Sequence, residues 1–173
     1  MEAQRAPSIV WIATKYGLIQ GVLSFVLFLV GTLTGVNRSW PSWVSLVVLI
    51  VVMVLAHREF KKTHEGMMTY PQGLGSGTLL SSVATVLTCI LLFVYVKYIN
   101  TGYVAASIQA QQAALEQRGI TGAQADQAMA VTNAITTPVG IVITTLIIGV
   151  LVGFVIALIV SIFTRKGDPR AVI

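Results

Sequence analysis

The histidines are the first side chains in this sequence that could do chemistry. There are two, His57 and His64, and both follow the uncharged part of the second apolar run, which ends at Ala56. A bis-histidine haem needs its ligands on facing helices inside a bundle. A metal site needs further ligands at a suitable spacing. Neither pattern is present, so we interpret both histidines as solvated loop residues and expect no cofactor and no metal.

Two further patterns resemble active sites. The glycine-rich segment 73–78 resembles an anion-binding loop, but no strand precedes it and no lysine follows it. Serines occur within the apolar runs, yet no histidine or carboxylate lies at membrane depth to activate them as nucleophiles. We therefore expect that the protein is not an enzyme.

These side chains belong to a chain whose main solvent is the bilayer. Its residues are 55% hydrophobic and 10% charged, whereas about a quarter of residues in soluble proteins are charged. Four apolar runs are long enough to cross a membrane, at about 16–36, 42–60, 73–98 and 138–164. We predict an all-α fold, a polytopic membrane protein with one membrane domain over 1–173.

Small side chains recur every fourth residue in two of the runs, where they would let helix backbones approach each other. The first run adds two further glycines at the same spacing. The expected helix-packing residues are Gly17, Gly21, Gly73, Gly77, Ser81, Thr85, Thr145, Gly149, Gly153, Ala157 and Ser161. We predict that the third and fourth spans pack against each other, antiparallel, through these two rows.

The second run contains no glycine, and we expect it to be the span that most faces lipid. None of the four runs contains a charged residue or a histidine between Gly17 and Val36, Ser42 and Ala56, Gly73 and Val96, or Pro138 and Thr164. Ionisable groups at membrane depth mark ion and proton pathways. Their absence argues against a proton-coupled pump.

The segment 100–137 is rich in glutamine and alanine and is polar enough to lie in water. Helix formers occupy 104–118, Gly119 follows as a C-terminal cap, and Thr121 with Gln124 forms a capping box for a second helix. We predict a helical hairpin outside the bilayer. Thr137 and Pro138 then open the last span as cap and first helical residue.

Basic residues favour one side of the membrane. Eight Lys and Arg residues lie in the N-terminal lead, the second connection and the C-terminal tail, against three on the opposite ends. The positive-inside rule then places both termini in the cytoplasm and the hairpin in the periplasm. Anionic lipid headgroups are the partners that we expect for Arg58, Lys61, Lys62, Arg165 and Lys166. Membrane orientation alone would equally require Arg58, Lys61 and Lys62. Nucleic acid is not an expected partner.

Several short segments carry a resemblance to a known family. They are 16–21 at the start of the first span, 66–78 leading into the third, the turn at 115–121, and Pro138 before a glycine-rich last span that ends in Arg165 and Lys166. With these segments the chain resembles an uncharacterised four-helix membrane family of Bacteroidota, domain of unknown function 4199. The resemblance implies an inner-membrane location and no particular activity.

Packing surface without chemistry suggests a structural or accessory subunit of the inner membrane, associated with itself or with another membrane protein. The alternative is a small channel or carrier for an uncharged or lipidic substrate, lined by Ser, Thr and Gly from the first, third and fourth spans. A fixed-ratio partner in gentle detergent would favour the first reading, and a homo-oligomer with a wet centre would favour the second.

Overall fold

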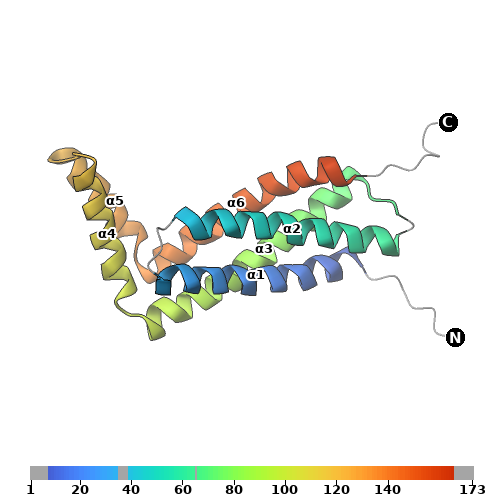
Figure 1. Ribbon diagram of the computed structural model, residues 1–173, viewed down its shortest axis with the longest axis horizontal. Coiled ribbons are helices and arrows are strands. Elements are labelled where there is room, and N and C mark those ends of the chain that lie inside the picture. The colour runs from blue at the N-terminus through green and yellow to red at the C-terminus, as the bar shows by residue number, and fades with distance from the viewer. Residues whose placement is uncertain (1–7, 35–38, 65, 166–173) are drawn as a thin grey trace. The chain divides into compact units, whose positions relative to one another are not determined.

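The computed structural model describes residues 8–34, 39–64 and 66–165 (Figure 1). In chain order the elements are α1 (Ile9–Thr34), α2 (Ser39–Thr63), α3 (Tyr70–Val94), the π-helix η1 (Tyr95–Ile99), α4 (Tyr103–Gln117), α5 (Ala123–Ile135) and α6 (Pro138–Thr164). Four stretches are long and apolar enough to cross a membrane: Ile9–Thr34, Trp43–Thr63, Tyr70–Ile99 and Pro138–Thr164. The prediction of an all-α fold with four such helices is confirmed.

Three of the four spans begin earlier in the chain than predicted. α1 starts at Ile9 rather than 16 because Ser8 caps it, with its hydroxyl accepting the amide of Trp11 at 3.2 Å. α3 starts at Tyr70 rather than 73, so Pro71 lies in its first turn, where a missing N–H is no loss.

α2 extends past both of its predicted limits, 42 and 60, and carries His57 and the following basic residues. α6 has the predicted bounds, and the Thr137 hydroxyl accepts the Gly140 amide at 3.0 Å as its cap. The predicted end of the first span at 36 lies outside the described residues.

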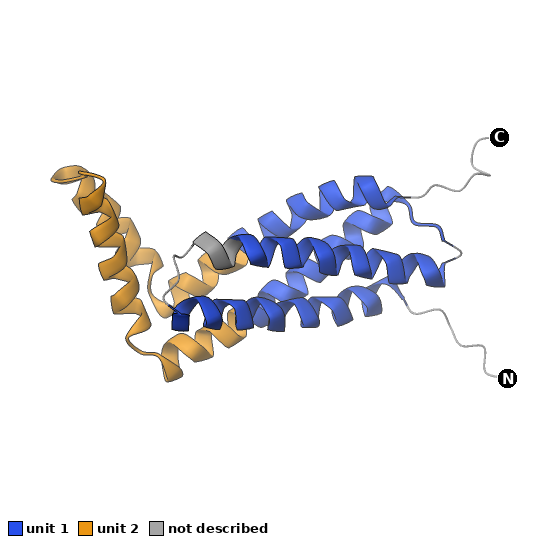
Figure 2. Cartoon of the chain, in the orientation of Figure 1, with its two compact units in different colours: residues 1–88, 148–173 blue, residues 89–147 orange. Residues whose placement is uncertain are grey.

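The chain divides into two compact units (Figure 2). Unit 1 comprises residues 1–88 and 148–173, and unit 2 comprises residues 89–147. Within unit 1, the C-terminal ends of α2 and α6 lie at the same end as the N-terminal ends of α1 and α3 (Figure 1). The expectation of a single membrane domain over the whole chain stays a prediction.

Unit 1 has an apolar core in which α1, α2 and α3 meet. Its fully buried side chains include Ile12 from α1, Ala56 and Phe60 from α2, and Leu80 from α3. A second cluster joins Met53 of α2 to Ala157 and Val160 of α6. α2 therefore buries one complete face. A larger share of α2 than of α1 or α6 is buried, so the expectation that α2 faces lipid most is wrong.

Unit 2 contains the helical hairpin of α4 and α5, which contact each other. The turn after α4 is a Schellman motif, in which the Ile120 amide donates to the Leu115 carbonyl at 3.0 Å and Gly119 has a φ of +70°. The capping box predicted at Thr121 is wrong, because Gly122 is the N-cap of α5 and no side chain caps the helix. Gly122 has a φ of +64°, and this turn moves Thr121 out of the capping position.

Candidate functional site

Close contacts join α3 to α6 along most of unit 1. A methyl group added at Gly77 would lie 2.8 Å from Ala157 Cβ, and one at Gly149 would lie 2.7 Å from Thr85 Oγ1. One at Gly153 would meet the side chain of Ser81. Each step of four residues along α3 matches a step of four back along α6, so the two helices run antiparallel with their small residues face to face.

The same register continues toward the end of the bundle, where a methyl group at Gly73 would lie 3.0 Å from Ser161 Oγ. Thr145, the remaining member of the α6 row, lies in unit 2 and is half-buried.

α1 approaches α3 just as closely from another side. A methyl group at Gly17 would lie 2.8 Å from the carbonyl oxygen of Leu80, and one at Gly21 would lie 2.9 Å from that of Ala84. Thr88 Oγ1 donates to the Gly21 carbonyl at 3.2 Å. A step of four residues forward along α1 matches a step of four forward along α3, so the two helices are parallel. α3 is thus the central helix of unit 1, held at backbone distance by α1 and α6.

Most of the serine and threonine hydroxyls of α3 are turned back onto its own backbone. Ser81 donates to the Gly77 carbonyl at 3.0 Å, Thr85 to the Ser81 carbonyl at 2.8 Å, and Thr88 to the Ala84 carbonyl at 2.9 Å. Such bonds satisfy a hydroxyl without a partner from another molecule. Two buried hydroxyl oxygens, Thr78 Oγ1 and Ser161 Oγ, have no hydrogen-bond partner among the described residues.

His57 is fully buried, so its interpretation as a solvated loop residue is wrong. It lies on α2, and its Nε2 is 3.1 Å from the Gly73 carbonyl oxygen of α3. Its Nδ1 is 2.8 Å from Thr164 Oγ1 of α6. A carbonyl can only accept, so Nε2 donates to Gly73 in the singly protonated ring and Nδ1 is left as an acceptor. The single hydroxyl proton of Thr164 can go either to Nδ1 or to the Val160 carbonyl, which lies 2.8 Å from the same oxygen. One imidazole therefore joins three helices.

The sequence contained a signal for this burial. Met53, His57 and Phe60 are spaced at i, i+4 and i+7, and all three are buried on one face of α2. Charged residues surround Phe60 in the sequence, so the apolar spacing was not recognised as a buried helix face. His64, by contrast, is half-buried at the end of α2 and stacks on Phe60 with ring centroids 4.0 Å apart.

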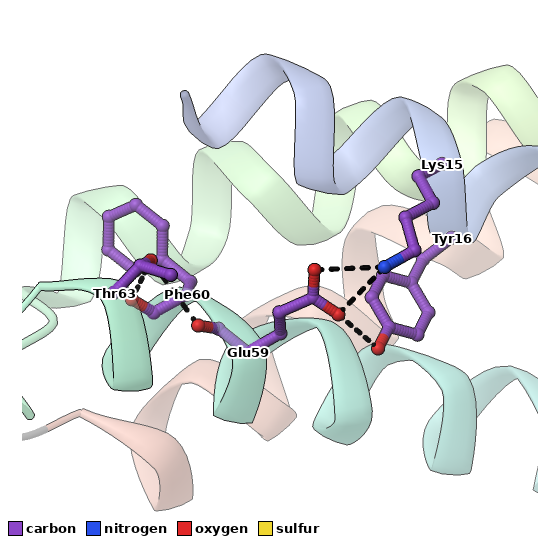
Figure 3. A network of polar contacts seen from close by, with 5 residues as sticks. All are labelled: Lys15, Tyr16, Glu59, Phe60 and Thr63. Carbon is purple, nitrogen blue, oxygen red and sulfur yellow. Dashed lines mark hydrogen bonds and ion pairs between the residues drawn. The ribbon is translucent and has the colours of Figure 1, made fainter. Parts of the chain in front are cut away.

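A second polar cluster joins α1 to α2 (Figure 3). Lys15 Nζ donates to both carboxylate oxygens of Glu59, at 2.9 and 3.0 Å, and the Tyr16 hydroxyl donates to Oε2 at 2.6 Å. The Lys15 and Glu59 side chains keep 43% and 30% of their exposure, so water reaches the ion pair. Sequence reasoning missed this cluster, because its members are far apart in the chain and lie outside the uncharged runs.

The residues expected at lipid headgroups divide into two kinds. Lys61 donates to the Thr164 carbonyl at 3.1 Å, which places its charge at the C-terminus of α6, where a helix dipole favours a cation. Arg58, Lys62 and Arg165 are exposed, and their side chains have no hydrogen bond or ion pair with any described residue. Lys166 lies outside the described residues.

A family comparison matches most of the chain. Residues 15–166 match the model of a family described as protein of unknown function (DUF4199). The chain belongs to this family. It matches no curated protein and no solved structure. Membership of DUF4199, a family of unknown function, brings no activity with it.

Proposed function

We propose that this DUF4199 protein is a structural or accessory subunit of the bacterial inner membrane, without catalytic chemistry of its own. Its termini lie in the cytoplasm and its hairpin lies in the periplasm. It associates with another membrane protein or with further copies of itself.

The observation that carries the proposal is the position of α3. Gly17 of α1 and Gly149 of α6 bring neighbouring helices to backbone distance from it, and the hydroxyls of Ser81 and Thr85 are bound to its own carbonyls. A carrier path would need such hydroxyls free to line it. The hydroxyls of Ser81, Thr85 and Thr88 on α3 are instead bound to backbone carbonyls inside unit 1.

The hairpin supplies the surface for a partner. Leu115 on α4 is buried, while Val131 and Ile135 on α5 remain 57% and 46% exposed. Both helices are otherwise rich in exposed glutamine and alanine. A small apolar patch with a polar surround suits a protein contact in water better than burial in lipid.

Purification from the native membrane in a mild detergent tests the proposal. We expect a second protein, or further copies of this chain, to co-purify at a constant ratio through successive columns. The alternative of a carrier predicts that the purified chain makes vesicles permeable to small uncharged solutes. Such permeability in vesicles that contain only this chain would contradict the proposal.

A further inference from the structure

The lipid-facing stripe of α2 changes character near its end. Four exposed apolar side chains, Trp43, Val47, Val51 and Leu55, follow one another at four-residue spacing. The next exposed positions in the same sector of the helix are Arg58 and Lys62. Residues four apart lie on one helix face, so the face that meets hydrocarbon continues directly into two cations.

α6 shows the same change at the same end of unit 1. Its exposed apolar residues Ile159, Ile162 and Phe163 are followed at once by exposed Arg165. The bond from Lys61 to the Thr164 carbonyl brings the ends of the two helices to one level. Arg165 therefore lies at the level of Lys62, and both cations lie beside lipid-facing apolar side chains.

The depth of this level fits the surface of a bilayer. From Ser39 to Arg58 α2 rises by about 28 Å, close to the hydrocarbon thickness of about 30 Å. Glu59, the acidic residue described at this end, has both carboxylate oxygens bound by Lys15 and Tyr16. Among the described residues Glu59 makes its ion pair with Lys15, and it acts on Lys62 only through the longer-range field of its charge.

We propose that Arg58, Lys62 and Arg165 form a binding surface for the headgroups of anionic phospholipids, the basic collar of unit 1. Lys61 is not part of it, because its ammonium group caps α6. The two charges that α2 presents one turn apart, together with Arg165, would attract a phosphate diester whose acyl chains lie along the apolar stripe above them. This surface goes beyond the proposed function and does not depend on which leaflet the collar faces.

Spin-labelled lipids test the collar in the full-length protein. The protein is reconstituted in phosphatidylcholine vesicles containing a trace of spin-labelled phosphatidylglycerol or spin-labelled phosphatidylcholine. Electron paramagnetic resonance then measures the immobilised fraction of each. We expect the native protein to prefer phosphatidylglycerol. Lys62→Gln should lower this preference by about fivefold, the effect of one cation at the surface.

Lys61→Gln is the matched control, since it removes the same charge one residue away. It should lower the preference by less than about twofold while lowering the Tm more than Lys62→Gln does. Equal losses of preference in the two variants would overturn the collar, because they would indicate a diffuse charge effect. Circular dichroism of both variants checks that the helices are retained.

A soluble phosphate ester is the competing occupant. Glycerol 3-phosphate added to the same vesicles should displace spin-labelled phosphatidylglycerol no more than sodium chloride does at equal ionic strength. Stronger displacement would show that the cations bind a free phosphate ester, and the lipid surface would then be refuted.

Discussion

His57 stabilises the end of unit 1 through both nitrogens of one ring. The Gly73 carbonyl and the Thr164 hydroxyl that it binds belong to different helices. A buried polar group with both partners present contributes stability, whereas its removal leaves a cavity and unsatisfied neighbours. At this scale one residue contacts α3 and α6 from α2.

His57→Ala tests these contacts. The change removes a fully buried side chain with two hydrogen bonds, so we expect the free energy of unfolding in detergent to fall by roughly 2–4 kcal/mol. His64→Ala is the control, because His64 is half-buried and bonds only within its own helix end. We expect it to lower the free energy of unfolding by less than about 1 kcal/mol. Similar losses in the two variants would mean that His57 does not join the helices.

At the scale of elements, α3 is the helix on which unit 1 depends. Its neighbours reach it only because Gly17, Gly21, Gly149 and Gly153 have no side chains. In lipid no hydrophobic effect drives helices together, so contact density must do so. A larger side chain on these contact faces should push the helices apart. The same change on a lipid-facing surface should not affect their packing.

Gly153→Leu is the direct test of that packing. The added side chain would collide with Ser81 on α3. We therefore expect the free energy of unfolding to fall by about 1–3 kcal/mol, the usual range for overpacking. Val47→Leu is the control, because Val47 is 57% exposed on the lipid-facing stripe of α2. Unfolding in sodium dodecyl sulfate measures both. Equal stability of the two variants would place Gly153 on an open face.

Much of this element arrangement could be predicted from composition and spacing. The uncharged run at 138–164 predicted α6 with its bounds, because nothing inside it could end a helix and Thr137 and Pro138 open it. The starts of α1 and α3 were predicted too late. Lys15 was taken to precede the first span and Pro71 to precede the third. Lys15 instead lies within α1, on an exposed face beside Glu59, and Pro71 occupies the first turn of α3.

The polar clusters could be predicted far less well. Burial of His57 depends on where α3 begins and where α6 ends, and these positions are set by packing between distant parts of the chain. The role of Lys61 depends on the same meeting of α2 with α6. The spacing of apolar residues within one helix predicts which face is buried. It does not predict which residues of other helices contact that face.

At the scale of the whole molecule, the distribution of charge predicts how the chain crosses the membrane. The described cations of unit 1 lie at one end of it: Lys15, Arg58, Lys61, Lys62 and Arg165. Retention of Lys and Arg on the cytoplasmic side then orients all four spans together.

Single-cysteine labelling tests this orientation. In a Cys89→Ala background, Lys62→Cys and Gln112→Cys both place a thiol at an exposed position. A membrane-impermeant maleimide added to spheroplasts should label position 112, and it should label position 62 only after the inner membrane is permeabilised. Labelling of position 62 in intact spheroplasts, with position 112 protected, would reverse the proposed orientation.

The central claim is that the chain serves as a subunit through its hairpin, and native mass spectrometry of the particle from mild detergent tests it most directly. We predict that the intact 18.5 kDa chain appears with a constant additional mass from its partner. A variant in which a short linker replaces residues 103–134 should still insert, as shown by the labelling of position 62, but should appear as a single chain. If this variant keeps the same additional mass, or if the intact chain appears alone, the account is contradicted.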